Sequence, residues 1–101
     1  MSINATVAGN TATINMTGRF DFGVQRDFKE AYDSQLNNAA VSAIEVNLAG
    51  VDYLDSSALG MLLMLRERSS AAGKSLKLCR PGAGVAQILE IANFSKLFTI
   101  V

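Results

Sequence analysis

Histidine is absent from this chain of 101 residues, which also lacks tryptophan and has one cysteine and one proline. Without histidine, no serine or cysteine can be activated by an imidazole base, and histidine-based metal sites are excluded. The single cysteine, Cys79, cannot form a disulfide within the chain. Because Leu76-Lys77-Leu78-Cys79 alternates as a strand does, we expect Cys79 to be a buried structural thiol in a reducing cytosol.

A surplus of charge is also lacking, since nine basic and nine acidic residues give a formal net charge of zero. This balance gives no sign of binding to nucleic acid or to an anionic membrane. No apolar run approaches the roughly 18 residues of a membrane span, and the first five residues do not resemble a signal peptide. We expect a cytoplasmic protein with protein partners, which is a monomer when free.

Half of the residues are apolar, which suffices for one domain, residues 1–101, with a core that needs no metal or disulfide. Alternating residues predict a hairpin of strands 3–8 and 11–18. Periodicity predicts helices over 21–38 and 56–72 and from about Val85 to Ala92, and strands over 41–48, 75–79 and 94–101. This order predicts an α/β fold with right-handed crossovers and a mixed, mostly parallel sheet.

The stretch Asp55-Ser56-Ser57 stands between the apolar strand and the second helix. A helix start has unpaired N–H groups and the positive end of the macrodipole, so these residues can cap the helix and a phosphate is well received there. Capping alone is a sufficient explanation. Asp55 could also orient the Ser56 hydroxyl in the active site of an incoming kinase. Asp52, expected in the same loop, is interpreted as solvated rather than as part of an acid/base pair.

The second helix is apolar on nearly every side over its first two turns. At about 100° per residue, Leu63 and Met64 point away from the face that we expect in the core. Gly60 costs about 1 kcal/mol against alanine inside a helix. It therefore indicates the close approach of a backbone, either from a neighbouring loop of this chain or from a partner. The expected core face consists of Ala58, Met61, Leu62 and Leu65.

A second candidate for phosphate binding is Gly82-Ala83-Gly84, which follows Arg80-Pro81 at a strand-to-helix turn. It lacks the Lys-Ser/Thr of a P-loop and the spacing of a dinucleotide site, so we interpret it as a flexible helix entry. The sequence thus predicts neither an enzyme nor a cofactor or metal.

The hexapeptide Asp55-Ser56-Ser57-Ala58-Leu59-Gly60 resembles the signature of STAS domains, which include the bacterial anti-sigma factor antagonists. In that family the first serine of the pair takes a phosphate, which implies Ser56, although the physics of the residues alone does not separate it from Ser57. Thr17-Gly18-Arg19-Phe20-Asp21 is similar to the family's Gly-x-Phe/Leu-Asp strand end, whose aspartate lies near that serine. Ala58 stands where the best-known antagonists have glycine.

The resemblance implies an anti-sigma factor antagonist that acts by partner switching. Its unphosphorylated form would bind an anti-sigma factor or a serine kinase of that type and so free a sigma factor. A GHKL-type kinase would phosphorylate Ser56, and a PP2C-type phosphatase would reverse this. The alternative is a STAS subunit of a transport assembly, where a similar helix face packs on an ATPase subunit without a phosphoswitch. The residues expected to contact the partner are Asp21, Asp55, Ser57, Gly60 and Met64.

Overall fold

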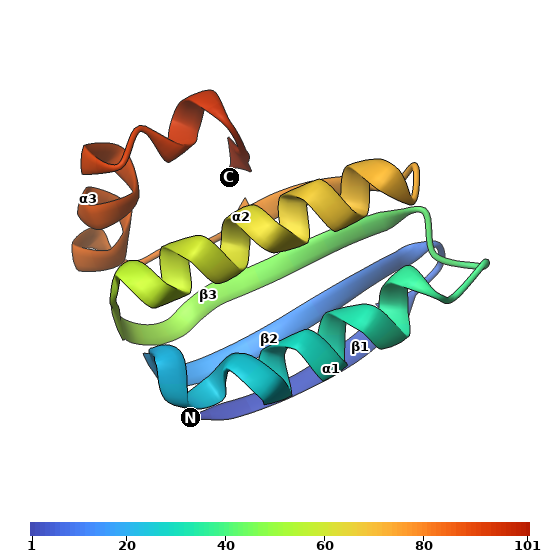
Figure 1. Ribbon diagram of the computed structural model, residues 1–101, viewed down its shortest axis with the longest axis horizontal. Coiled ribbons are helices and arrows are strands. Elements are labelled where there is room, and N and C mark those ends of the chain that lie inside the picture. The colour runs from blue at the N-terminus through green and yellow to red at the C-terminus, as the bar shows by residue number, and fades with distance from the viewer.

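Five strands form one sheet in the order β1-β2-β3-β4-β5, and the first three strands lie side by side in Figure 1. The computed structural model describes residues 1–101. β1 pairs with β2 antiparallel, whereas all other neighbours pair in parallel. The predicted α/β domain with a mixed, mostly parallel sheet and an N-terminal hairpin is therefore confirmed. The strands are β1 (Ser2–Ala8), β2 (Thr11–Phe20), β3 (Ala43–Leu54), β4 (Ser75–Cys79) and β5 (Thr99–Ile100).

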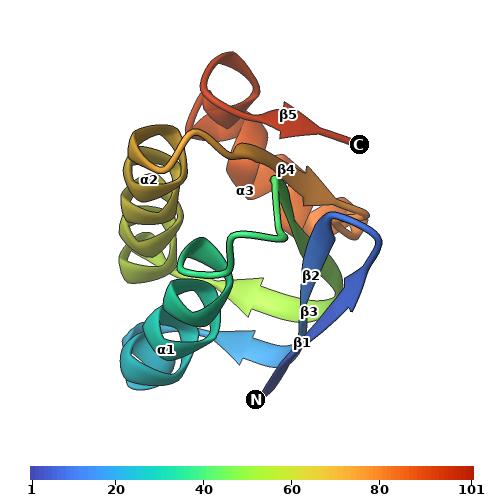
Figure 2. The same ribbon diagram turned by 90° about the vertical axis from the view of Figure 1, so that its right-hand side faces the viewer.

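Helices α1 (Gln25–Leu36) and α2 (Ser56–Ala71) lie side by side on the same face of the sheet (Figure 2). The shorter α3 (Ala83–Ile91) packs against β3. Two 3₁₀ turns, η1 (Phe22–Val24) and η2 (Phe94–Lys96), precede α1 and follow α3. None of these helices has the length and apolar character needed to cross a bilayer.

The core lies between the sheet and the pair α1 and α2. Buried residues alternate along β2 and the first half of β3, as expected for strands with one covered face. The predicted core face of α2 is confirmed, because Ala58, Met61, Leu62 and Leu65 are all buried, and Leu63 and Met64 are exposed as expected.

β3 continues to Leu54, so the prediction that the strand ends at Leu48 and that Asp52 lies in a loop is wrong. The register between β2 and β3 shifts twice, and β3 carries an extra residue at each shift. Buried residues then recur every third position, at Leu48, Val51 and Leu54, so the alternation typical of a strand is lost. Gly50 lies at the first shift, where an added Cβ would be 2.8 Å from the carbonyl oxygen of Met16.

The first helix begins later than predicted. Asp21 caps the turn η1 rather than α1, with its Oδ1 accepting the Gly23 N–H at 3.0 Å. α1 itself starts at Gln25, has no side-chain cap, and ends at Leu36 rather than 38.

The last strand is shorter than predicted, because β5 covers only Thr99–Ile100. Phe94, expected in that strand, belongs to η2. Its ring stacks on Phe98 with 5.0 Å between centroids, and both rings are buried. Phe94 and Phe98, which suggested a long strand, thus pack into the core from η2 and the residues that follow it.

Lys74 connects the end of α1 to the rest of the domain by hydrogen bonds. Its Nζ donates to the carbonyl oxygens of Asn38 at 2.7 Å, Val41 at 2.6 Å and Gln35 at 3.4 Å. These carbonyls lie at the C-terminal end of α1 and in the segment that leads to β3, where the helix macrodipole favours a cation.

We therefore expect Lys74→Met to lower the free energy of unfolding by about 1.5 to 3 kcal/mol, the usual contribution of hydrogen bonds to a charged group. Urea unfolding followed by circular dichroism measures this change. Lys77→Met is the matched control, since Lys77 is exposed on β4 and its loss should stay within about 0.5 kcal/mol. Equal losses for the two variants would contradict the role given to Lys74.

Candidate functional site

β2 and β3 end side by side, and this brings the two predicted motifs together. Phe20 is the register partner of Leu54, so Asp21 and Asp55 follow from neighbouring positions at the carboxyl ends of parallel strands. The Asp55 N–H donates to the carbonyl oxygen of Phe20 at 3.3 Å, which connects the two segments directly.

Asp55 and the two serines form the start of α2. The Asp55 side chain is the N-cap and accepts the Ala58 N–H at 2.9 Å. Ser56 is the first helical residue and is exposed, whereas Ser57 is half-buried. The two serines, equivalent by sequence, therefore differ in access, and Ser56 is the more accessible to another protein.

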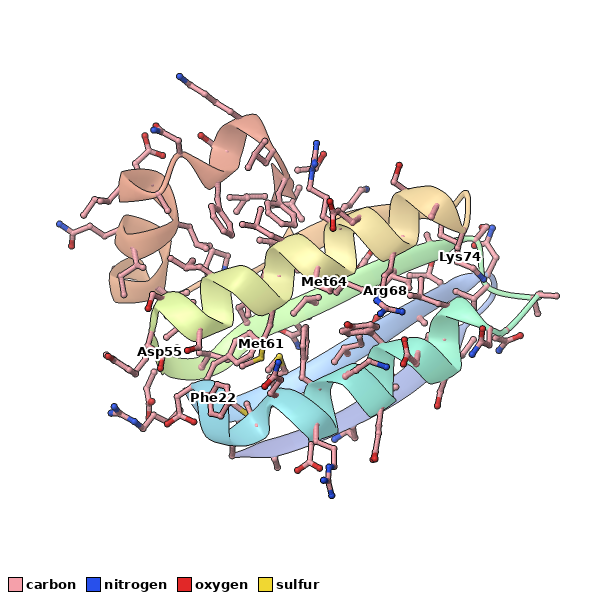
Figure 3. All side chains as sticks on the ribbon, in the orientation of Figure 1. Phe22, Asp55, Met61, Met64, Arg68 and Lys74 are labelled. Carbon is pink, nitrogen blue, oxygen red and sulfur yellow. The ribbon has the colours of Figure 1, made fainter.

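A groove of about 360 Å³ lies between α1 and α2, next to these serines. Figure 3 shows Met61, Met64 and Arg68 along α2, with Phe22 at the same end of the molecule as Asp55. Ser57 lines the groove, and Ser56 is the residue directly before it in α2. The lining residues from η1 and α1 are Phe22, Gln25, Phe28, Lys29 and Tyr32, and those from α2 are Ser57, Gly60, Met61, Met64 and Arg68.

Two large apolar side chains of the groove remain open to solvent. Phe22 is 66% exposed and Met64 is 45% exposed. A Cβ added at Gly60 would meet no atom within 4 Å. Close packing of a loop of this chain against Gly60, one of the two explanations that the sequence left open, is therefore wrong, whereas approach by a partner stays a prediction.

The two ends of the groove differ in charge. At one end are Asp21 and Asp55, and at the other are Lys29 and Arg68. Lys29 Nζ lies 2.6 Å and Arg68 Nη1 lies 4.0 Å from the Asp33 carboxylate, so two cations share one anion there.

Tyr32, on the floor of this basic end, is buried. Loss of solvent raises the pKa of Tyr32, Arg68 acts in the opposite direction, Asp33 adds to the rise, and Lys29 opposes it. The phenol is therefore neutral at physiological pH and adds no charge of its own to this end.

Arg19 is a cation near the acidic end. Its Nε lies 3.3 Å from Asp21 Oδ2, and its guanidinium lies 4.0 Å above the ring of Tyr53. This cation–π contact attracts the guanidinium to the face of the Tyr53 ring and so holds it near Asp21. Arg19 thus partly balances the charge of Asp21.

Three residues of this surface were not found from the sequence: Phe22, Tyr53 and Arg68. Of the three, only Phe22 could have been identified from the sequence, because it is an aromatic residue that directly follows a capping aspartate and lies off the apolar stripe of the helix. Tyr53 and Arg68 become neighbours of the site only through the extension of β3 and the packing of α2 on α1.

The other sequence candidates lie outside this surface. Cys79 is buried, as predicted, and its Sγ lies 3.6 Å from Glu45 Oε1. Burial raises the pKa of the Cys79 thiol, and the Glu45 carboxylate raises it further, so the thiol stays protonated. Gly82 is the N-cap of α3 without a side-chain hydrogen bond, as expected for a helix entry.

A hairpin followed by three helices that alternate with parallel strands forms a small α/β domain, with an exposed serine at the start of α2. The family model described as "Mlab, STAS domain" matches residues 3–101. The chain therefore belongs to the STAS-domain family.

Among its relatives is a STAS-domain containing protein of Pseudomonas aeruginosa (strain UCBPP-PA14). The two chains are 42% identical over 94 residues, which is 91% of this chain and 89% of the relative.

Solved structures share the fold at low identity. SpoIIAA, an anti-sigma factor antagonist, matches in its unphosphorylated form with a TM-score of 0.75 at 17% identity over 99% of this chain and 87% of the other. Its phosphorylated form, from Bacillus, matches with a TM-score of 0.74 at 17% identity over 99% and 91%. The STAS domain of a SulP transporter from Vibrio cholerae matches with a TM-score of 0.74 at 18% identity over 94% and 75%.

The exposure of Met64 and the burial of Leu62 lead to opposite expectations for stability. Leu62→Ala should lower the free energy of unfolding by about 2 to 5 kcal/mol, because Leu62 is fully buried. Met64→Lys should change it by no more than about 0.5 kcal/mol. Thermal melts of the two variants test this, and a Met64→Lys protein as unstable as Leu62→Ala would place Met64 in the core.

Proposed function

We propose that this protein is an anti-sigma factor antagonist that acts by partner switching. In its unphosphorylated form, the groove between α1 and α2 binds an anti-sigma factor or a serine kinase of that type, which releases a sigma factor. The observation that carries the proposal is the exposed Ser56 directly before Ser57, which lines an apolar groove whose Phe22 and Met64 are open to solvent.

The start of α2 suits phosphorylation of Ser56. A phosphate adds about −1.5 to −2 charges, and at a helix N-terminus this charge is favoured by the macrodipole. The Ser56 side chain caps no other group in the chain, since the capping hydrogen bond comes from Asp55. We therefore expect the fold to stay the same when Ser56 is phosphorylated.

The effect of the phosphate is on the partner. Together with Asp55, and with Asp21, whose charge Arg19 balances only in part, it makes an acidic patch at the end of the groove that a bound protein would cover. An unpaired charge buried in an interface costs about 2 to 5 kcal/mol, which lowers the affinity by tens to thousands of times. Phosphorylation would thus separate the two proteins without unfolding either.

The proposed partners are all proteins of the cytoplasm. A GHKL-type serine kinase would phosphorylate Ser56, and a PP2C-type phosphatase would remove the phosphate. The chain itself acts as a binding module rather than as an enzyme, because it has no histidine to activate a hydroxyl.

A second candidate is a STAS subunit of a transport assembly. It is favoured by the family description "Mlab, STAS domain" and by the similarity to the STAS domain of a SulP transporter. In that case the same helix face would pack on an ATPase subunit, and phosphorylation of Ser56 would play no part.

The phosphorylated residue can be identified directly. Incubated with its kinase and ATP, the protein should gain one phosphate on Ser56, and Ser56→Ala should remove it, because Ser57 is half-buried. Peptide mapping by mass spectrometry is the measurement, with Ser57→Ala as the matched control that keeps the label. A phosphate on Ser57, with Ser56→Ala still labelled, would contradict the assignment.

Phosphomimetic variants test the mechanism. Ser56→Asp and Ser56→Glu should keep the circular dichroism spectrum and melting temperature of the unmodified protein, yet lose binding to the anti-sigma partner that Ser56→Ala keeps. Ser95→Glu, which adds the same charge at an exposed residue of η2, should bind normally. Authentic phospho-Ser56 protein separates a weak mimic from a wrong mechanism, and its tight binding would refute the switch and favour the transport subunit.

A further inference from the structure

The outer edge of the sheet at β1 is unusually open to strand pairing. β1 is the first strand of the sheet and pairs only with β2, along its full seven residues. Exposed edge strands are normally protected by charged residues, proline, bulges or short length. β1 (Ser2–Ala8) contains no charged residue and no proline, and its pairing with β2 runs without a register shift.

The opposite edge does not share this property. β5 is only two residues long, and it follows a turn that contains Lys96. The difference between the two edges means that any partner that adds a strand to this sheet would add it at β1.

We propose that β1 pairs antiparallel with β1 of a second copy of this chain. A two-fold axis at Ala5 places Ile3 opposite Val7 of the second copy and Asn4 opposite Thr6 of the second copy. The central pairs then match in character, apolar with apolar and polar with polar, and no charges in β1 oppose each other. Val7 is 48% exposed in the single chain and would be covered by this pairing.

The polar face of the sheet supports the same register. Asn47 Nδ2 donates to Asn15 Oδ1 at 3.0 Å, and Asn15 Nδ2 donates to Asn4 Oδ1 at 3.2 Å and to Thr6 Oγ1 at 3.3 Å. This ladder crosses β3, β2 and β1 and stops at the edge. The Asn4 amide then has a donor left, and in the proposed register it faces the Thr6 hydroxyl of the second copy.

The proposed dimer leaves the groove free. β1 is at the edge of the sheet (Figure 2) and lies beside α1, whereas the groove lies between α1 and α2. The pairing therefore does not rest on the proposed function, and a dimer would present two grooves at once. One strand pair is a small interface, so we infer a weak, concentration-dependent dimer in place of the monomer expected from the sequence.

Sedimentation equilibrium of the whole chain tests this pairing, in moderate salt that screens the carboxylates of Asp27 and Glu30 beside β1. The unmodified chain should dimerise, and Val7→Lys should raise the dissociation constant at least about tenfold by placing an ammonium opposite Ile3. Thr99→Lys, the matched charge on the other edge strand, should leave it unchanged. A chain that is monomeric up to about 1 mM, or two variants that dimerise alike, would overturn the proposal.

Cross-linking tests the register, because the ratio of the rates of two variants at equal concentration depends on which residues lie opposite each other. In the proposed dimer the two copies of residue 5 lie about 4.5 to 5.5 Å apart, within the range of a disulfide. Ala5→Cys should form a disulfide dimer under mild oxidation much faster than Ser2→Cys, whose two copies lie far apart on the same paired strands. Equal rates, or a faster reaction of Ser2→Cys, would show that the register is wrong. Circular dichroism confirms that each variant is folded.

Discussion

The parallel pairing of β2 with β3 is the constraint on which the rest of the structure depends. It continues past two register shifts to Phe20 and Leu54, and so it delivers Asp21 and Asp55 to the same edge of the sheet. Each aspartate then caps the element that follows, η1 in one case and α2 in the other. The groove exists because η1 and α2 start side by side, and because α1, which follows η1, then runs beside α2 on the same face of the sheet. Gly50 permits the first shift, since any side chain there would meet the backbone of β2.

The same pairing explains which parts of the fold and of the site could be predicted from the sequence. Strand β4 and the start of α2 follow from local patterns, alternation at Ser75–Cys79 and a capping aspartate before an apolar helix, and both are found where predicted. The end of β3 was missed because an extra residue at each shift breaks the alternation that identifies a strand. Helical geometry alone could place Met64 outside the core, but not on the groove. Tyr53 and Arg68 could not be placed near the site, because their positions depend on contacts between segments distant in the sequence.

At the start of α2, one residue caps the helix and the next is exposed to solvent. Asp55 satisfies the Ala58 N–H, so the helix does not need the Ser56 hydroxyl for its stability. Ser57 lines the groove and is half-buried, whereas Ser56 is exposed and makes no side-chain hydrogen bond that stabilises the helix. A residue in such a position can change its charge by two units while the fold stays the same, because the helix N-terminus stabilises the added anion.

The length of the groove determines which partners can sense that charge. Ser56 and Arg68 lie twelve positions apart on α2, about 18 Å at 1.5 Å per residue, which exceeds the Debye length of about 8 Å at physiological salt. The basic pair of Lys29 and Arg68 is thus too distant to neutralise a phosphate on Ser56. A partner that covers the end with Phe22 and Ser57 must desolvate the phosphate, whereas one seated only on Tyr32 and Arg68 would not detect it. Under the proposed function, the end of the groove that the partner occupies would therefore decide whether phosphorylation of Ser56 acts as a switch.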